Sequence, residues 1–295
     1  LKNYPNSPQF EEINNLVVSS FVHQQDYQGA LNYLNKRKSV NNRKLIQEVS
    51  LYRGIQLFND NKTTEALQYL REATRSENPK VYTSSKYWLA ESYFALSDFD
   101  EAISLFEELK KSASKESLEE HPFLDYQIGY AFFKQKNYKN ALPYFSSFLA
   151  NENDDFSYLA DSRLREGDCN YALTNYNQAI ASYNKIIQND YPGVDYATYQ
   201  IAMSYGFLNE NGQKIRTLKK LVNEIAVSNL KDDALFQLAS TYTKIKNHQL
   251  AHKAYDRLLS KYPRSPFISR SLIRQGLLYY NDDLNTKALE KYKAV

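Results

Sequence analysis

Cysteine, glycine and proline are scarce in this sequence of 295 residues, and each shortage excludes a class of fold. The single cysteine, Cys169, rules out an internal disulfide framework and is compatible with either redox compartment. Eight glycines and eight prolines are too few for a sandwich or barrel, which needs a turn about every ten residues. No run approaches the roughly 18 apolar residues that span a bilayer.

Charge of one sign is also lacking. The 37 basic and 34 acidic residues give a formal net charge of +3, so no overall attraction to nucleic acid is implied. Tyrosine, in contrast, is abundant, with 26 residues beside 15 phenylalanines. A tyrosine ring can be half buried while its hydroxyl meets water. This composition suits a thin, extended protein better than a thick globule.

The sequence repeats a pattern of small and large residues with intervals of 35 to 39 residues. A small residue, with one lysine as the exception, recurs at Ala30, Ala66, Ala102, Ala141, Ala179, Lys214, Ala251 and Ala288. Another apolar, mostly small residue precedes each of these anchors by twelve positions, at Val18, Gly54, Ala90, Gly129, Gly167, Ala202, Ala239 and Gly276. A large apolar residue follows each anchor by four positions, as Phe106 follows Ala102. Eight copies of one structural unit are therefore predicted.

Each copy has the spacing of two amphipathic helices. Apolar residues recur at helical intervals on both sides of a short polar break, such as Ser97-Asp98, Gln25-Asp26 or Lys136-Asn137. Helices joined so tightly must approach closely, and a large side chain at their crossing would cost about 1–3 kcal/mol. We therefore expect the two small residues of each copy, such as Ala90 and Ala102, to form the contact between its helices.

These residues resemble the tetratricopeptide repeat (TPR), in which Trp, Leu, a small residue and Tyr of a first helix precede Ala and an aromatic of a second. Trp88-Leu89-Ala90, Tyr93, Ala102 and Phe106 match that pattern closely. The resemblance covers nearly the whole chain and implies an all-α, right-handed solenoid of about eight helix-turn-helix units. Lys214 and Asn170 depart from the pattern. We expect the Lys214 stem to extend outward and the sixth helix pair to pack more loosely.

The repeats are placed at residues 10–44, 45–78, 79–117, 118–155, 156–192, 193–228 (degenerate), 229–264 and 265–295 (truncated). Residues 1–9 resemble the tail of a preceding repeat, and Val295 falls inside a second helix. We therefore expect the parent protein to be longer.

The junctions Tyr4-Pro5-Asn6-Ser7-Pro8 and Tyr262-Pro263-Arg264-Ser265-Pro266 combine a helix stop with a helix start. Before a helix like that of Trp88, they are similar to junctions in TPR proteins of the Gram-negative envelope, such as the Tol–Pal-associated periplasmic protein and the β-barrel assembly lipoprotein. This resemblance implies a periplasmic or outer-membrane-associated protein. The alternatives are an efficient helix stop with no further meaning and a cytoplasmic location.

Residues for catalysis are few, and we expect neither an enzyme nor a bound metal or cofactor. His248 and His252 have a spacing that suits metal binding, but they are expected to straddle a turn without a third ligand. Cys169 is expected to be a packed thiol rather than a nucleophile. No phosphate-binding or nucleophile motif is present. The basic cluster from Lys36 to Lys44 is interpreted as a solvated helix end, with nucleic acid or anionic lipid as the alternative.

The residues expected to bind a partner lie on the inner face of the first helices of stacked units. They are Tyr87, Glu91, Phe94, Tyr126, Tyr130, Phe133, Arg165, Asp168, Tyr171 and Tyr199. The alternative for each ring is packing against the neighbouring unit. Glu91 would repel the carboxylate that some TPR domains bind.

The favoured function is a non-enzymatic scaffold that holds a protein or an extended peptide in an aromatic-lined groove. The alternatives are a module that binds glycan such as peptidoglycan, and a sensor or regulatory arm of a longer protein. End-to-end self-association through the terminal helices is a further expectation.

Overall fold

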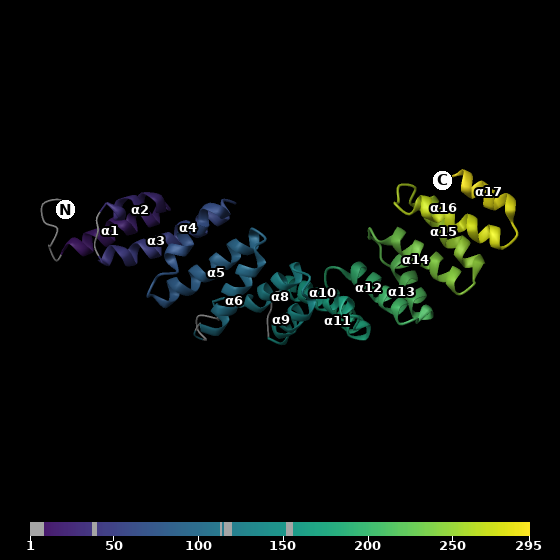
Figure 1. The fold of residues 1–295 in the computed structure, drawn as a ribbon, viewed down its shortest axis with the longest axis horizontal. Coiled ribbons are helices and arrows are strands. Elements are labelled where there is room, and N and C mark those ends of the chain that lie inside the picture. The colour runs from purple at the N-terminus through teal and green to yellow at the C-terminus, as the bar shows by residue number, and fades with distance from the viewer. Residues whose placement is uncertain (1–8, 37–39, 113, 115–119, 152–155) are drawn as a thin grey trace. The chain divides into compact units, whose positions relative to one another are not determined.

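The computed structural model describes residues 9–36, 40–112, 114, 120–151 and 156–295 (Figure 1). Throughout these ranges the chain forms α-helices joined by turns, and no described residue belongs to a β-strand. The predicted all-α fold is therefore confirmed. The predicted junction at residues 4–8 and residues 37–39 of the basic cluster lie outside the described ranges. Among the helices described, none is long and apolar enough to cross a membrane.

The chain divides into two compact units, and the boundary between them falls inside a single helix. In its described residues, unit 1 (Leu1–Tyr144) contains three helical hairpins, a further helix and the start of the next. Its helices are α1 (Gln9–His23), α2 (Tyr27–Asn35), α3 (Val40–Asn59), α4 (Thr63–Ala73), α5 (Pro79–Ala95), α6 (Phe99–Ser112), α8 (Leu124–Lys134) and the first part of α9 (Tyr138–Ala150). The hairpins stack in chain order, α2 on α3, α4 on α5 and α6 on α8. The repeat boundary predicted between residues 44 and 45 falls inside α3.

Unit 2 (Phe145–Val295) contains the rest of α9 and four complete hairpins. Its helices are α10 (Phe156–Ala172), α11 (Tyr176–Gln188), α12 (Val194–Phe207), α13 (Asn211–Asn223), α14 (Lys231–Lys244), α15 (His248–Lys261), α16 (Ile268–Asn281) and α17 (Asn285–Lys293). Here α11 stacks on α12, α13 on α14 and α15 on α16. Within each unit the hairpins thus form a helical solenoid.

One backbone turn joins the two helices of all eight hairpins. The residue five before each anchor adopts the left-handed conformation, with φ between 57° and 64°, at Gln25, Asn61, Ser97, Lys136, Thr174, Asn209, Lys246 and Asp283. The next N–H donates to the carbonyl five residues back, as Asp98 N does to Tyr93 O at 2.9 Å. This Schellman bond satisfies an end carbonyl of the first helix. The polar breaks predicted from the sequence are confirmed as these turns.

The small residues of the first helices make room for a large side chain of the second helix. A Cβ on Gly54 would lie 2.6 Å from the Leu70 side chain, and one on Gly167 would lie 2.5 Å from the Tyr183 ring. Leu70 and Tyr183 each follow their anchor alanine by four residues. The glycine of the first helix therefore faces the large residue of the second. Ala90 and Ala102 are both fully buried in one core cluster, and the direct contact expected between them stays a prediction.

The sixth hairpin, α12–α13, accommodates Lys214 in a way that the sequence did not predict. The Lys214 side chain is half buried and reaches Gln237 of the next hairpin, to whose Oε1 its Nζ donates at 3.1 Å. Its stem passes over Gly206, where a Cβ would lie 3.2 Å from the lysine Cδ. Burial lowers the pKa of Lys214, and the nearby Lys244 lowers it further. The predicted outward direction is therefore wrong.

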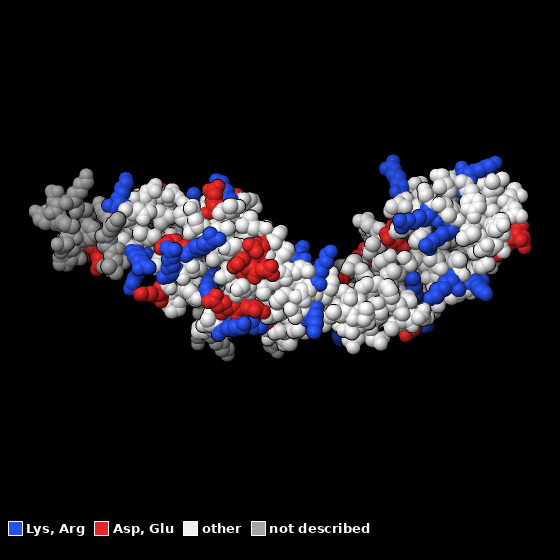
Figure 2. Space-filling model, in the orientation of Figure 1, with Lys and Arg blue, Asp and Glu red and all other residues white. Residues whose placement is uncertain are grey.

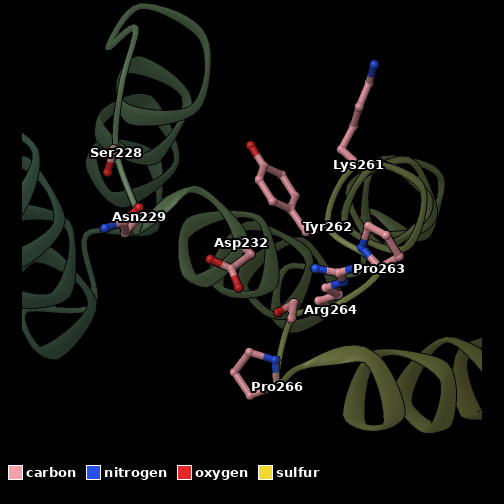
Figure 3. A pocket seen from close by; sticks show the side chains of 9 residues that line it. Ser228, Asn229, Asp232, Lys261, Tyr262, Pro263, Arg264 and Pro266 are labelled. Carbon is pink, nitrogen blue, oxygen red and sulfur yellow. The ribbon is translucent and has the colours of Figure 1, made fainter.

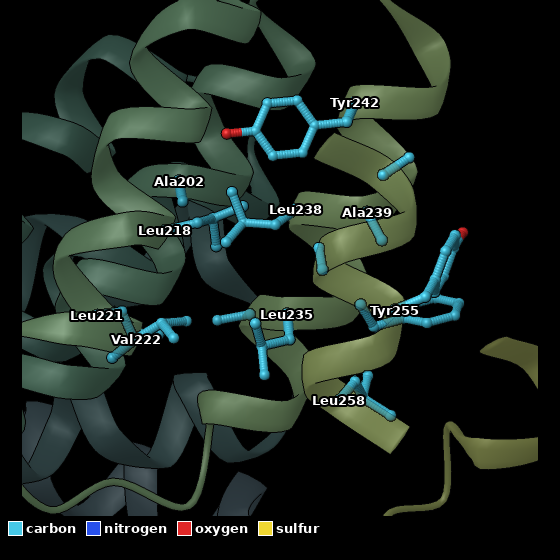
Figure 4. Close-up of a cluster of buried hydrophobic side chains, with 14 of the residues drawn as sticks. Ala202, Leu218, Leu221, Val222, Leu235, Leu238, Ala239, Tyr242, Tyr255 and Leu258 are labelled. Carbon is cyan, nitrogen blue, oxygen red and sulfur yellow. The ribbon is translucent and has the colours of Figure 1, made fainter. Parts of the chain in front are cut away.

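The largest apolar core of unit 2 runs from α12 to α16 (Figure 4). Leu218 and Leu221 of α13 pack with Leu235 and Leu238 of α14, and all four are buried. A separate cluster in the same unit joins α11 to α12 through Tyr183, Ile186 and Ile201. The apolar cores thus lie between stacked helices, and the faces turned away from them can carry function.

Candidate functional site

The ten residues predicted to bind a partner lie on first helices of both units. Unit 1 holds six of them on α5 and α8, and unit 2 holds Arg165, Asp168 and Tyr171 on α10 and Tyr199 on α12. All ten are partly buried. In α16, the residues at the corresponding positions are far more exposed, with Ile273 at 47%, Leu277 at 51% and Tyr280 at 60%. Within each unit, the neighbouring hairpin therefore covers part of the side chains at these repeat positions.

In unit 1 the predicted residues gather with Gln127 into one surface, which we call the α5–α8 face. It consists of Tyr87, Glu91 and Phe94 of α5 and of Tyr126, Gln127, Tyr130 and Phe133 of α8. The Tyr130 ring is central, with centroids of Phe94 at 6.2 Å, Tyr126 at 5.4 Å and Phe133 at 6.1 Å. These separations are typical of interacting aromatic rings. The rings thus form a connected apolar strip along two first helices.

Glu91 is the carboxylate of this face. Its Oε1 accepts a hydrogen bond from Gln127 Nε2 at 2.5 Å, and the same Nε2 lies 2.5 Å from the Tyr87 hydroxyl. Burial raises the pKa of Glu91 to about 7, although the bond from Gln127 acts in the opposite direction. Glu91 forms no ion pair with any described residue. The carboxyl group therefore changes its charge near neutral pH.

Two other titratable groups border the α5–α8 face. The His121 ring stacks on Tyr87 with centroids 4.1 Å apart, and burial lowers its pKa. The Lys134 Nζ lies 5.2 Å from the centroid of the Tyr130 ring. On the surface shown in Figure 2, basic and acidic side chains are intermingled rather than gathered by sign. The character of the α5–α8 face is thus set by its rings and by Glu91.

In unit 2, Asp168 is a carboxylate whose hydrogen-bonding capacity is already used. Its Oδ1 accepts from the hydroxyls of Tyr183 at 2.7 Å and Tyr196 at 2.8 Å. Its Oδ2 accepts from Arg165 Nη1 at 2.5 Å, and Arg165 also pairs with Asp161 at 3.2 Å. Burial raises the pKa of Asp168 in spite of these partners. The group ties α10 to α11 and α12, and its predicted role in partner binding stays a prediction.

The exposed rings of unit 2 lie beside this group. Tyr171 contacts Tyr176 and Phe207, with centroid distances of 5.6 Å and 5.7 Å, and Phe207 stacks on Tyr176 at 4.9 Å. The Phe207 side chain is 59% exposed. Tyr199 is half buried, and burial raises its pKa to about 12. A second aromatic surface is therefore present in unit 2.

The two histidines do not straddle a turn, contrary to the sequence prediction. Both lie on α15, and Asp282 approaches them from the end of α16, with its Oδ1 2.5 Å from His248 Nδ1 and its Oδ2 3.8 Å from His252 Nε2. The His252 ring stacks on Tyr279 at 3.9 Å. Among the described residues, no group of three metal-ligating side chains has a geometry suited to a metal. These contacts join the last two hairpins.

Cys169 is buried, and burial raises the pKa of its thiol to about 12. The expected packed thiol is thus confirmed. A nucleophilic role would require a thiolate, which burial disfavours here.

The predicted junction at residues 262–266 forms one wall of a pocket in unit 2 (Figure 3). The pocket has a volume of about 400 Å³ and lies between the α13–α14 and α15–α16 connections. Its two serine hydroxyls accept local backbone bonds, Ser228 from Leu230 N at 3.0 Å and Ser265 from Phe267 N at 3.2 Å. The helix stop is confirmed, because α15 ends at Lys261, but the expected serine cap is wrong: α16 begins at Ile268 after Phe267, and Ser265 bonds within the preceding turn.

Several residues of these surfaces were not identified from the sequence. They are Gln127 and His121 beside Glu91, Phe207 and Tyr176 beside Tyr171, and Asp282 beside the histidines. The sequence gives a hint for Phe207, because this ring directly follows Gly206 at the end of α12, the first helix of its hairpin. Gln127 has none, because an amide on a helix face is usually solvated.

Comparison with known proteins agrees with this architecture. The tetratricopeptide repeat family matches residues 53–117, 126–193 and 233–265, which together exceed half of the chain. No curated protein sequence matches the chain significantly.

Solved structures of low sequence identity share the fold. The C-terminal part of a TPR repeat-containing protein from Cytophaga hutchinsonii is 15% identical with a TM-score of 0.64, covering 87% of this chain and 98% of its own. A tetratricopeptide repeat protein from Parabacteroides merdae is 14% identical with a TM-score of 0.54, covering 85% and 92%. YrrB, described as a TPR protein with an unusual peptide-binding site, is 20% identical with a TM-score of 0.51, covering 67% and 91%. The family match over more than half of the chain shows that the chain belongs to the tetratricopeptide repeat family, and the stacked hairpins have the fold of that family.

Proposed function

We propose that the protein is a non-enzymatic scaffold that holds an extended peptide, or an extended segment of a partner protein, on the α5–α8 face. Stacked helical repeats present long surfaces of this kind to binding partners. Peptide binding by YrrB, a structural neighbour, is in keeping with this role.

The connected rings of the α5–α8 face carry the proposal. Phe94, Tyr126, Tyr130 and Phe133 lie in ring contact yet remain partly open to solvent. A ring that becomes fully buried contributes about 1.5–3 kcal/mol. Rings already packed against each other lose little side-chain entropy when a ligand covers them. The strip therefore offers binding energy at several adjacent points, as an extended peptide requires.

The test is selection of octapeptides from a random display library, followed by titration of the selected peptides. Tyr126→Ala with Tyr130→Ala should weaken their binding by about a hundredfold, because two ring contacts are lost. Tyr126→Phe with Tyr130→Phe keeps both rings and should bind nearly as the native protein does. Circular dichroism and thermal melting should show that both variants fold.

Unchanged affinity in the folded alanine variant would contradict the proposal. If the double variant melts early, the single change Tyr126→Ala gives the same test with a loss of about tenfold. Tyr280→Ala, in an exposed side chain of unit 2, serves as the control that should leave binding unaltered.

We further propose that the rings of Tyr171 and Tyr199 in unit 2, with Arg165 and Asp168, form a second contact surface. The exposed Phe207 beside Tyr171 supports this role. Phe207→Ala should lower affinity for a long partner and spare an octapeptide held by unit 1. Equal loss for both ligands, or loss for neither, would contradict it.

We propose a location in the bacterial cell envelope, periplasmic or associated with the outer membrane. The junction Tyr262-Pro263-Arg264-Ser265-Pro266, which separates α15 from α16, supports it by its resemblance to envelope TPR proteins. Fractionation of the source cells should recover the protein with periplasmic or membrane markers. Recovery with cytoplasmic markers would contradict this location.

We also propose end-to-end association with a second copy through the outer face of α16 and α17. In other repeats, the neighbouring hairpin covers the positions equivalent to those of Ile273, Leu277 and Tyr280. Here these three side chains are exposed, and Leu289 of α17 is 53% exposed. A helical face of this character is the one on which another hairpin stacks. Sedimentation should show association that rises with concentration and that Leu277→Lys abolishes. A monomer at all concentrations would contradict it.

A further inference from the structure

Two acceptor atoms of the α5–α8 face receive no hydrogen bond from a described residue. Within the described residues, Glu91 Oε1 is engaged by Gln127, whereas Glu91 Oε2 has no partner. Oε2 is absent from the buried atoms without partners, so it meets solvent. Gln127 Oε1 is buried and also has no partner. Both atoms can only accept, because an ionised carboxylate and an amide oxygen carry no proton.

A donor that satisfies Glu91 must also suit its aromatic surroundings. Phe94 follows Glu91 by three residues on α5, and Tyr130 follows Gln127 by three residues on α8. Residues three apart are neighbours on a helix surface. The Phe94 and Tyr130 rings therefore lie about one turn from the Glu91–Gln127 pair, with Tyr87 one turn away on the other side. Ring faces attract cations within about 6 Å of their centroids.

The native charges leave this position open to a cation. Lys134 is the basic side chain on the ring strip, and its Nζ is at the Tyr130 ring rather than at Glu91. Burial lowers the pKa of His121, which disfavours its cationic form, and the ring stacks on Tyr87. The remaining titratable groups of the face are the hydroxyls of Tyr87, Tyr126 and Tyr130. A carboxylate taken out of water without a cation is unfavourable, and a ligand that supplies one removes that cost.

We propose that the peptide bound on the α5–α8 face carries a lysine or arginine whose side-chain cation pairs with Glu91 between the rings of Tyr87, Phe94 and Tyr130. This rests on the proposed function, and it goes further by naming the chemistry of the partner. An acidic peptide would bring a second negative charge to Glu91. A purely apolar peptide would leave both acceptors without donors.

The experiment compares libraries selected with the native protein and with Glu91→Gln. The native protein should enrich octapeptides with Lys or Arg at one fixed position, next to aromatic or aliphatic residues. Replacement of that Lys by norleucine should weaken binding to the native protein about ten- to a hundredfold, as for a charge-assisted hydrogen bond. The same replacement should change little with Glu91→Gln, whose amide is neutral.

The affinity of the lysine peptide should also depend on pH. A proton competes with the cation for Glu91, so binding to the native protein should weaken as the pH falls from 8 to 6, on either side of a pKa of about 7. Binding to Glu91→Gln should stay constant over this range.

The outcomes separate this inference from the proposed function. Enriched peptides that lack a cation, and that still depend on Tyr126 and Tyr130, would overturn the inference and leave the scaffold function standing. No enrichment beyond that of Tyr126→Ala with Tyr130→Ala would overturn both. A norleucine effect of equal size in the native protein and in Glu91→Gln would place the cation away from Glu91 and overturn the inference alone.

Discussion

At the scale of single residues, Glu91 and Asp168 occupy the same position of the repeat but have different partners. Glu91 is buried beside one amide, whereas Asp168 receives two hydroxyls and a guanidinium. An under-satisfied buried carboxylate lowers stability, and a fully bonded one supports it. The two residues thus form a natural pair for comparing function with structure.

The pKa of Glu91 predicts a fall in stability with rising pH. Its ordinary value of 4.5 is raised to about 7, so between these values the folded state binds more protons than the unfolded chain. The free energy of unfolding should therefore fall by about 3 kcal/mol over this window and level off above it, at about 1.4 kcal/mol for each pH unit. Glu91→Gln should remove this fall, as urea unfolding from pH 4.5 to 8 would show. Parallel pH curves for the two proteins would speak against a buried, titrating Glu91.

Asp168→Asn should lower the free energy of unfolding, because this carboxylate supports the fold. The neutral amide forms no ion pair with Arg165, and its single oxygen cannot accept from both the guanidinium and the two hydroxyls as the carboxylate does. We expect a loss of about 1–3 kcal/mol in the free energy of unfolding at pH 7. Urea unfolding measures it, and a variant as stable as the native protein would show that the network is dispensable.

The sequence predicted where both carboxylates lie but not how they differ. The repeat period places them on the inner face, because position within a helix pair follows from spacing alone. Their partners lie elsewhere in the chain: Gln127 is 36 residues from Glu91, and Tyr196 is 28 from Asp168. Which polar side chains meet across stacked hairpins depends on packing geometry that the period does not encode.

At the scale of the helical hairpin, the left-handed turn residue limits stability. Thr174 has a φ of 63°, a conformation that costs a residue with a Cβ about 1–2 kcal/mol. Thr174→Gly should therefore raise the free energy of unfolding by about 0.5–1 kcal/mol, after the greater freedom of glycine in the unfolded chain is counted. Urea unfolding is again the measurement.

The matched control for Thr174→Gly is Ala172→Gly. Ala172 is the exposed last residue of α10, where glycine has no conformational advantage, so this change should lower stability. A loss of stability in both variants would contradict the argument from the left-handed turn.

The close contact between a small residue and a large one is the second feature that limits the stability of a hairpin. Gly54→Ala would place a Cβ 2.6 Å from the buried Leu70 side chain. We expect a loss of about 1–3 kcal/mol from overpacking. Combined with Leu70→Ala, which by itself leaves a cavity, the glycine change should cost little, and a double-mutant cycle would show this coupling. Additive effects would mean that the two positions do not compete for space.

The hairpins themselves were predictable, and the exceptions have physical causes. The polar breaks located the turns, but the left-handed residue is not glycine in any copy, so its conformation had no direct signal. Lys214 was expected to extend outward because lysine is usually solvated. It stays half buried because Gly206 leaves space for its stem and Gln237 Oε1 accepts a hydrogen bond from its Nζ.

At the scale of the whole molecule, most of the fold was predicted from the repeat period. A regular spacing of small and large residues predicts a stack of hairpins, because each hairpin alone cannot bury its apolar face. The same regularity explains why inner-face rings are partly covered in the stack. Function depends on the part of each ring that stays open, which sequence spacing does not specify.

Trp88, the only tryptophan, allows a direct measurement of the central claim that the α5–α8 face binds peptides. Its ring lies 5.7 Å from that of Tyr87, so a peptide bound on this face should alter its fluorescence. Titration with a library-selected peptide should give a saturable change in Trp88 emission that Tyr126→Ala with Tyr130→Ala removes. Tight binding that leaves Trp88 emission unchanged, or an identical titration in the folded double variant, would contradict the account.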